Sequence, residues 1–299
     1  MCKVSVLMPV YKTKEEYLKE AIESILGQTF KDFELLILDD CPEDPRENIV
    51  KCYKEERIVY LKNEKNLGIS ASRNKLIDLA KGEYLAVFDH DDISFPERLK
   101  KQVEFLDNNQ DYGVVSGQQE FFVGKNRFSN YPNSNLEIKK ALMYGNVVAH
   151  TALMLRKSVL EKTNIRYEEK YSPCEDYMLV LRLIEHTMFY NFSEPLVKYR
   201  NLEGNTSHLK SEKMEDRAIL CNCYAFKNYP YLYEQNKPIN SVGYKSYYLK
   251  LFKFIPFAKV KINQYKLKVY LFGFILLFSM NKKWLIAKSV GSLENNIQN

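Results

Sequence analysis

Three carboxylates follow a short apolar segment in the first third of the chain. The segment Tyr84–Phe88 has the character of a buried β-strand, and Asp89, Asp91 and Asp92 come directly after it. Because Asp89 and Asp91 are two positions apart, both side chains can turn toward one point where the strand gives way to a loop. Carboxylate oxygens are hard ligands that suit Mg²⁺ or Mn²⁺, shared with a diphosphate. Taken alone, the same residues equally fit a solvated acidic turn in front of the next helix.

The elements that must position these acids alternate between strand and helix. Apolar runs at Val4–Val10, Phe33–Leu38 and Ile58–Leu61 predict strands, and apolar residues recur at helical spacing after the first of them. Residues 70–81 favour a helix, and Gly82 stands where a left-handed cap would end it. Alternating strands and helices predict a parallel sheet joined by right-handed crossovers.

A second acidic pair follows the second predicted strand. Asp39 and Asp40 come at the end of Phe33–Leu38, as Asp89 comes at the end of its own strand. Strands of one parallel sheet point the same way, so both acidic ends lie on one edge of the sheet. Ligands of open α/β sheets bind at this edge. Solvation alone explains poorly why both acidic strand ends lie on one edge. Together they therefore indicate a ligand site.

Five segments in this region resemble the family 2 glycosyltransferases. In chain order they are Val4–Tyr11 (VSVLMPVY), Ala21–Phe30 (AIESILGQTF), Leu38–Asp40 (LDD), Asn66–Asn74 (NLGISASRN) and Asp89–Asp92 (DHDD). A looser resemblance resumes at Cys174-Glu175-Asp176, around Tyr199-Arg200 and at Asn205-Thr206-Ser207. The resemblance implies the GT-A fold, an α/β nucleotide-sugar-binding domain with a mostly parallel central sheet flanked by helices.

The resemblance also implies a donor site at the strand ends. Pro9, Val10 and Tyr11 leave the first strand, and Tyr11 is placed to stack its ring on the nucleobase; the plainer alternative is a core tyrosine. Asp40 resembles the acid that accepts a hydrogen bond from uracil N3–H, which favours a UDP-sugar donor. Asp39 is placed in the same donor-binding set, where it supports the loop.

Two further donor contacts and a metal ligand come from the same resemblance. Arg73 resembles a basic residue near the donor, whose guanidinium can pair with a diphosphate, although an ordinary surface helix arginine is an equal alternative. Asp91 is the expected ligand of a divalent cation, Mn²⁺ or Mg²⁺. Asp89 is expected to contact the ribose or a metal-bound water.

The expected catalytic base lies downstream. Cys174-Glu175-Asp176 precedes a segment of helical periodicity, where acids also act as simple caps because the helix dipole favours negative charge. The resemblance makes Asp176 the general base that takes the proton of an acceptor hydroxyl, so the sugar is transferred with inversion. Glu175 is the nearest competitor for this role. His150 resembles, more weakly, a residue lining the sugar or acceptor pocket.

The chain departs from the family pattern at two places, and each of them contains a cysteine. The usual glycine-serine after the second acidic pair is replaced by Cys41-Pro42, and the usual glycine before Glu175-Asp176 is Cys174. The chain has six cysteines without the spacing of a disulfide framework or a zinc site, which is typical of the reducing cytoplasm. The seven-residue strand pattern near the start also differs from a signal peptide.

The last sixty residues differ in charge from the rest. The net charge is +6, and residues 241–299 contain ten lysines and one glutamate among many aromatic and aliphatic residues. Such a segment can lie on an anionic membrane surface, or it can pack on the catalytic domain with its lysines solvated. No recognition motif for nucleic acid accompanies it.

These observations predict a GT-A catalytic domain over residues 1–210, with a nucleotide-binding half (1–100) and an acceptor half (101–210), and a helical basic and aromatic region over 211–299. The expected activity is metal-dependent transfer of a hexose or N-acetylhexosamine from a UDP-sugar to a growing surface glycan, glycolipid or lipid-linked oligosaccharide, at the cytoplasmic face of the membrane. The alternatives are a sugar-phosphate nucleotidyltransferase, which usually has a glycine-rich phosphate loop not seen here, and a non-catalytic nucleotide-sugar-binding partner.

Overall fold

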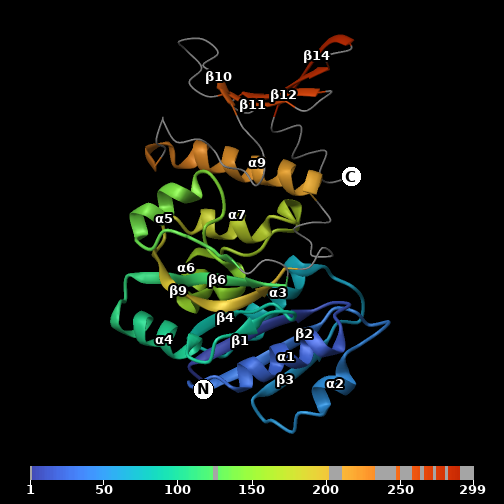
Figure 1. Ribbon diagram of the computed structural model, residues 1–299, viewed down its shortest axis with the longest axis vertical. Helices are drawn as coiled ribbons and strands as arrows, with labels where there is room; N and C mark the ends of the chain where they lie inside the picture. Colours follow the sequence, from blue (N-terminus) through green and yellow to red (C-terminus); the bar gives the residue numbers. More distant parts are fainter. Residues whose placement is uncertain are drawn as a thin grey trace.

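The protein was analysed as a computed structural model. It describes residues 2–123, 127–201, 211–232, 247–249, 258–262, 266–271, 274–279 and 282–289, and from residue 247 onward only the backbone is described. Figure 1 shows the N-terminal strands and helices at one end of the molecule and helix α9 far from them.

The first hundred residues alternate between strands and helices as expected. The elements are β1 (Val4–Val10), α1 (Glu15–Leu26), β2 (Phe33–Asp39), α2 (Glu47–Lys51), β3 (Ile58–Lys62), α3 (Ile69–Leu79), β4 (Tyr84–Val87) and β5 (Ile93–Ser94). Strands β1, β2, β3 and β4 are parallel, in the spatial order β3-β2-β1-β4. The strand order changes direction beside β1, because β2 and β3 lie on one side of it and β4 on the other. The crevice for a ligand is expected at the carboxyl ends of the strands at such a point.

The second half extends this sheet and covers it with helices. It contains α4 (Arg98–Asn108), β6 (Tyr112–Phe122), β7 (Arg127–Phe128), α5 (Asn135–Leu142), η1 (His150–Ala152), β8 (Met154–Arg156), α6 (Lys157–Thr163), η2 (Glu169–Tyr171), α7 (Glu175–Arg182), β9 (Met188–Arg200), α9 (Ser211–Asn228) and η3 (Pro230–Leu232). Strand β8 pairs antiparallel with β4 and β6, and β9 runs parallel to β6. Within the described residues the sheet has nine strands, with β7 paired to β6 off the main order.

The two faces of the sheet bury separate apolar cores, because alternate residues of each strand point to opposite faces. Val4, Val6 and Met8 of β1 pack with apolar residues of α1, α2 and α4. Leu7 of β1 faces the other way and packs with residues of α3, α5, α6, α7 and α9. Both faces are thus covered, as the near-continuous apolar runs of the strands predict.

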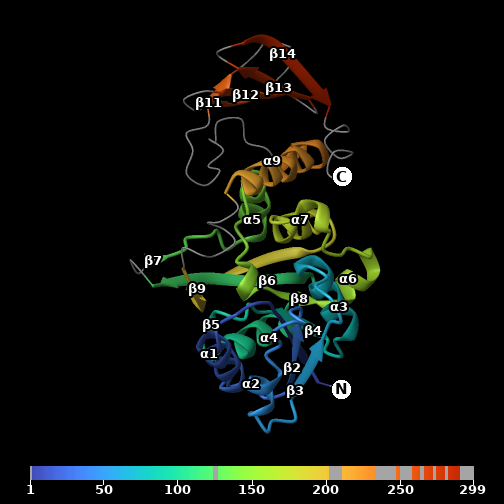
Figure 2. The same ribbon diagram turned by 90° about the vertical axis from the view of Figure 1, so that its right-hand side faces the viewer.

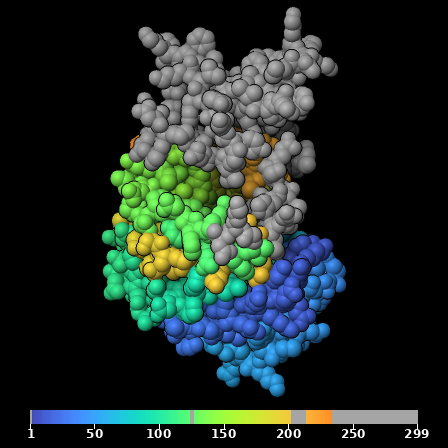
Figure 3. Space-filling model, in the orientation of Figure 1, coloured from blue at the N-terminus to red at the C-terminus, as the bar shows by residue number. Residues whose placement is uncertain are grey.

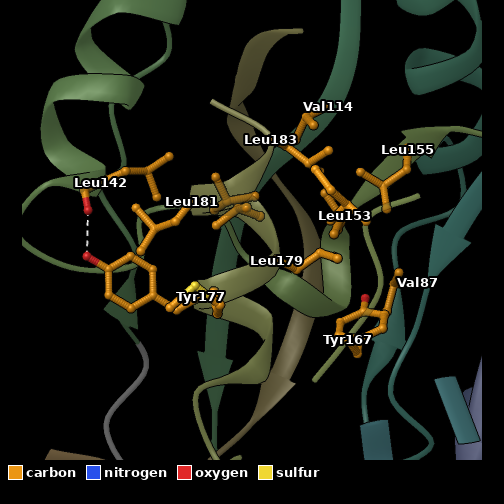
Figure 4. Close-up of a cluster of buried hydrophobic side chains, with 14 of the residues drawn as sticks. Val87, Val114, Leu142, Leu153, Leu155, Tyr167, Tyr177, Leu179, Leu181 and Leu183 are labelled. Atoms are coloured by element: carbon orange, nitrogen blue, oxygen red, sulfur yellow. Dashed lines mark hydrogen bonds between the residues drawn. The ribbon is translucent and has the colours of Figure 1, made fainter. Parts of the chain in front are cut away.

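Helix α7 lies at the centre of the second core. Leu179, Leu181 and Leu183 are fully buried, and the Tyr177 hydroxyl donates a hydrogen bond to the Leu142 carbonyl of α5 (Figure 4). Figure 2 shows α9 lying across α5 and α7, on the side away from the sheet. The Tyr177 hydroxyl oxygen also lies 2.9 Å from the side-chain amide of Asn222 on α9, within hydrogen-bonding distance. Helix α9 therefore packs in the same core as α5 and α7, whereas the sequence analysis places the end of the catalytic domain at residue 210, before this helix.

The carboxyl-terminal region is only partly helical, which corrects one expectation. Helix α9 fits the helical prediction, but the later described segments are strands: β10 (Tyr247–Leu249), β11 (Ala258–Ile262), β12 (Lys266–Leu271), β13 (Phe274–Ser279) and β14 (Lys282–Ser289). They pair antiparallel in sequence order. The reason is visible in the sequence of two of these segments. In Ala258–Ile262 (AKVKI) and at the start of Lys266–Leu271 (KLKVYL), lysines alternate with apolar residues, and this two-residue period is typical of a strand.

The predicted cap at Gly82 is also wrong. Helix α3 ends at Leu79 with Ala80 in an extended conformation, and Gly82 has no left-handed φ angle. Gly82 is required for a different reason, because a Cβ there would lie 2.5 Å from the backbone nitrogen of Ser5 and 2.7 Å from the carbonyl carbon of Val4. Glycine thus allows the segment before β4 to pass close to β1. Among the described residues, no helix has the length and apolar character needed to span a membrane.

Candidate active site

The end of β2 carries two buried acids with different partners. Asp39 is fully buried, and its carboxylate accepts hydrogen bonds from the backbone nitrogens of Cys41 (3.0 Å) and Arg46 (2.6 Å) and from the Tyr60 hydroxyl (2.9 Å). These contacts hold the loop that follows β2. Cys41 therefore takes the place of the usual glycine without loss of the turn, because the turn depends on its backbone nitrogen.

Asp40 holds the loop in front of α3. Its Oδ1 accepts hydrogen bonds from Nδ2 of Asn63 and the backbone nitrogen of Leu67, both at 2.8 Å, and its Oδ2 accepts one from the backbone nitrogen of Gly68 at 2.9 Å. Gly68 has a φ angle of +84°, a conformation that favours glycine. A carboxylate offers about four acceptor positions. One position of Asp40 thus remains for a donor group such as an imide N–H.

The end of β1 presents one exposed aromatic ring. Pro9 and Val10 are buried within the sheet, and the Val10 carbonyl accepts a hydrogen bond from the backbone nitrogen of Asp40 at 2.8 Å. Tyr11 is 42% exposed, and the Lys12 ammonium lies 5.1 Å from its ring centroid. The geometry rules out a core position for Tyr11 and leaves a ring available to stack on a base at the same strand edge as Asp40.

The acidic loop after β4 is held by Arg200 at the end of β9. The Arg200 backbone nitrogen donates to Oδ1 of Asp92 at 2.8 Å, and its Nε donates to the Asp91 carbonyl at 2.7 Å. The guanidinium also pairs with Glu20 of α1 and lies over the Tyr17 ring, at 4.1 Å. Asp92, the most buried of the three acids, is therefore a structural anchor. Burial, together with the nearby acids, raises its pKa well above the usual range.

Asp91 fits the expected cation. No hydrogen bond or ion pair links its carboxylate to the side chain of another residue in the part of the chain that is described. Burial, and then the nearby Asp89, raise the pKa of Asp91 more than His90 and Arg200 lower it, so a cation would stabilise its ionised form. Within that same part, no group of three His, Cys, Asp or Glu side chains is arranged to hold a metal ion. Ligands beyond Asp91 would therefore come from a diphosphate and water.

Arg73 of α3 joins the β4 loop to helix α7. Its guanidinium donates to Oε1 of Glu175 at 2.7 Å and to Oδ1 of Asp89 at 3.3 Å, and it lies 5.4 Å from the centroid of the Tyr167 ring. The Arg73 side chain is 9% exposed. Sequence reasoning placed Arg73 near the donor but did not foresee that two acids occupy the ends of its guanidinium.

Asp176 lies in the first turn of α7, directly after Glu175. Its Oδ2 accepts a hydrogen bond from Nδ2 of Asn146 at 3.1 Å. Burial, and then the neighbouring Glu175 carboxylate, raise the pKa of Asp176 to about 6. A carboxylate with this pKa is ionised at neutral pH and still accepts a proton more readily than an ordinary aspartate, as a general base must. Glu175 by contrast is engaged by Arg73, which makes Asp176 the better candidate.

The half-buried His150 pairs with the buried Tyr167 beside these acids. Nε2 of His150 lies 2.9 Å from the Tyr167 hydroxyl, and burial lowers the pKa of His150 to about 3, so the imidazole is neutral. Figure 4 shows the Tyr167 ring beside Val87, near the end of β4. Asn74 of α3 fixes the Tyr167 backbone by two hydrogen bonds of 2.9 and 3.0 Å.

Tyr167, Asn63 and Asn146 were missed by sequence reasoning. Asn63 shortly precedes the Asn66–Asn74 motif, which offered a weak signal. Tyr167 and Asn146 lie in stretches without a recognisable motif, and only the fold brings them to the site.

The structural comparisons define the fold. The chain resembles residues 1–349 of TarS of S. aureus in complex with UDP-GlcNAc, with a TM-score of 0.61 and 22% identity, over 76% of this chain and 67% of that TarS chain. It also resembles the mannosyltransferase PcManGT of Pyrobaculum calidifontis, in complex with GDP-Man and Mn²⁺, with a TM-score of 0.54 and 13% identity, over 75% of this chain and 63% of the other. The fold is the GT-A fold of glycosyltransferases, as the sequence predicted.

The sequence comparisons identify the family. The family model for glycosyl transferase family 2 matches residues 5–163. An uncharacterized glycosyltransferase of Methanocaldococcus jannaschii is 37% identical over 222 residues, which cover 71% of this chain and 76% of the relative. The β-1,3-glucosyltransferase WfaP of Escherichia coli, named for transfer from UDP-Glc to α-D-GlcNAc-diphosphoundecaprenol, is 30% identical over 183 residues, covering 60% and 70%. The chain belongs to glycosyl transferase family 2, which sets aside the alternative of a nucleotidyltransferase.

Proposed function

We propose that the protein transfers a hexose or N-acetylhexosamine from a UDP-sugar to a hydroxyl of a growing glycan, with inversion and with a divalent cation. The observation that carries the proposal is the placement of Asp176. A half-buried carboxylate with a pKa of about 6 stands on α7, next to Glu175, which Arg73 links to the acidic loop of β4. A base beside a donor site is the minimum that an inverting transferase requires.

The donor side of the proposal rests on the strand ends. Tyr11 offers a ring for the base, and the remaining acceptor position of Asp40 suits the N3–H of uracil. Asp89 follows β4 at the same edge and by this proposal contacts the ribose or a metal-bound water, and Asp91 is the residue that would hold Mn²⁺ or Mg²⁺. The complexes of TarS with UDP and with UDP-GlcNAc, and UDP-Glc in the name of WfaP, support uridine as the base.

The reaction then needs no covalent enzyme intermediate. Asp176 accepts the proton of the acceptor hydroxyl while that oxygen forms a bond to the anomeric carbon. The bond between the anomeric carbon and the diphosphate oxygen breaks, and its electron pair leaves with UDP. When bound, a divalent cation would offset the charge on the departing diphosphate. Attack from the face opposite the leaving group inverts the anomeric centre.

The acceptor belongs by this proposal to surface-glycan synthesis at the cytoplasmic face of the membrane. The lipid-linked acceptor in the name of WfaP supports this choice, as does the excess of lysine over residues 241–299. Membrane attachment through 241–299 remains part of the proposal, because no side chain of that segment is described.

A panel of nucleotide sugars tests the proposal directly. Purified protein is incubated with each donor and Mn²⁺, and release of the nucleoside diphosphate is measured with and without a lipid-linked or oligosaccharide acceptor. We expect release from a UDP-sugar that increases with acceptor. UDP binding without turnover for any donor and acceptor would instead favour a non-catalytic binding partner.

A further inference from the structure

The contact between Arg73 and its two acids spans three elements of the fold. Arg73 belongs to α3, Asp89 follows β4, and Glu175 begins α7, 102 residues away from Arg73 in sequence. The Arg73 and Glu175 side chains are only 9% and 8% exposed. Figure 3 shows the N-terminal residues (blue) meeting the middle of the chain (green to yellow) in one continuous body. The guanidinium is thus a buried connection between the donor end of the sheet and the helix that carries Asp176.

The surroundings of Arg73 fix its orientation. The ring of Tyr167 lies beneath the guanidinium at 5.4 Å, and Asn74, the residue after Arg73, holds the Tyr167 backbone from the same helix. Nε of Arg73 and Oε2 of Glu175 are buried and have no hydrogen-bond partner among the described residues. A buried ion pair that leaves polar atoms unsatisfied is poor evidence for a role in stability, because its desolvation costs as much as its attraction returns. Such a pair is better explained by a positional role.

We propose that Arg73 is a positioning residue, which through Glu175 and Asp89 sets the place of Asp176 relative to the donor site. This inference rests on the proposed base role of Asp176. It differs from the expectation that Arg73 pairs with the donor diphosphate, because each of its terminal nitrogens donates to a protein carboxylate and the side chain is only 9% exposed. Glu175 is then the partner that transmits the position of Arg73 to the first turn of α7.

The charges around Asp176 make this role measurable. The groups that face it are Glu175, Arg73, Asp89, Tyr167, Tyr131, Cys174 and Cys221. Glu175 raises the pKa of Asp176, whereas Arg73 lowers it. Removing the two partners of one ion pair must therefore move the pKa of the base in opposite directions, which a general loss of structure cannot do.

The experiment compares four variants with the wild type. In Arg73→Gln we expect the acidic limb of the kcat/KM profile to move upward by on the order of one pH unit, and in Glu175→Gln to move downward by a similar amount. The double variant should return close to the wild-type limb. Arg73→Lys keeps the charge but cannot hold both acids, so its limb should stay in place while kcat falls by roughly 10-fold or more. UDP affinity should stay within about 3-fold throughout.

Two results would overturn the proposal. If the acidic limbs of the kcat/KM profiles of Arg73→Gln and Glu175→Gln do not move in opposite directions, the ion pair between Arg73 and Glu175 does not act on the base. A loss of UDP affinity of about 30-fold or more in Arg73→Gln, with an unchanged limb, would place Arg73 on the donor instead. Because either glutamine variant alone leaves a buried charge unpaired, circular dichroism must confirm folding. If either is unfolded, Arg73→Lys, which keeps the charge, tests the idea, and unchanged kcat in Arg73→Lys would then overturn it.

A failure of the proposed function is separable from these outcomes. If Asp176→Asn keeps full activity, the acidic limb belongs to another group and the base role itself is wrong. If Asp176→Asn is inactive but the acidic limbs of Arg73→Gln and Glu175→Gln coincide, only the positioning role of Arg73 is overturned.

Discussion

Asp176→Asn should make the protein less active and more stable at the same time. The substitution keeps the shape of the side chain and can keep the contact with Asn146, since an amide offers both a donor and an acceptor. It removes the carboxylate that accepts the proton. A positioned base contributes about 10²–10⁴-fold to the rate, so kcat should fall by that amount while UDP affinity stays near wild type.

The effect on stability follows from the raised pKa. The pKa of Asp176 rises from 3.8 in the unfolded chain to about 6 in the folded one, so the folded state holds the proton more tightly. Stability therefore falls as the pH increases from about 4 to about 6, and the full cost applies above that range. At 1.36 kcal/mol per pKa unit this cost is about 3 kcal/mol at pH 8 and roughly half of that at pH 5.

Urea unfolding of both proteins at pH 5 and pH 8 measures this cost. We expect the variant to be more stable by about 3 kcal/mol at pH 8, with a clearly smaller difference at pH 5. Wild-type activity should in parallel decrease as the pH falls through about 6. Equal stability of the two proteins at both pH values would refute the idea that the folded state destabilises the ionised form of Asp176. A fully active variant would transfer that role to Glu175.

Four other perturbations test separate parts of the site and the fold. Asp91→Asn should abolish transfer and weaken UDP binding in Mn²⁺, because an amide is a poorer ligand; wild-type turnover in excess EDTA would contradict this. Tyr11→Ala should weaken UDP binding by roughly 5- to 100-fold, the value of a base–aromatic stack, measured by calorimetry. Gly82→Ala should cost about 1–3 kcal/mol of unfolding free energy, whereas Gly145→Ala, with nothing within 4 Å of its added Cβ, should cost little. Deletion of residues 241–299 should abolish flotation with anionic liposomes while UDP binding persists, and intact protein that fails to float would refute membrane attachment.

The first half of the fold follows from local sequence rules. Val4–Val10 is the strand that its apolar, β-branched run predicts, and β2 and β3 match their predicted ranges within one residue. The order of acids at strand ends also sufficed to place Asp39, Asp40 and Asp89 at one edge, because parallel strands leave no other arrangement.

The contacts within the site could not be predicted in the same way. Arg73 and Glu175 are far apart in the chain, and their pairing depends on the packing of α3 against the second half of the protein. The sequence also concealed the strands after residue 246. There we predicted a helical region from the basic, apolar and aromatic content, although the alternation of lysine with apolar residues favours strands.

The raised pKa of Asp176 is the feature that sequence reasoning would have given the wrong sign. Acids in the first turn of a helix are usually stabilised in their charged form, by about 0.3–1 kcal/mol, and so the position of Asp176 on α7 predicts a lowered pKa. In the structure the pKa is raised instead, because burial and the Glu175 carboxylate together outweigh the dipole and the attraction of Arg73. Arg73 holds the Glu175 side chain in place by an ion pair, and the Glu175 carboxylate in turn raises the pKa of its neighbour Asp176. Because Arg73 engages Glu175, Asp176 is the acid of the two that we propose as the base, and its raised pKa suits it to take the proton of the acceptor hydroxyl.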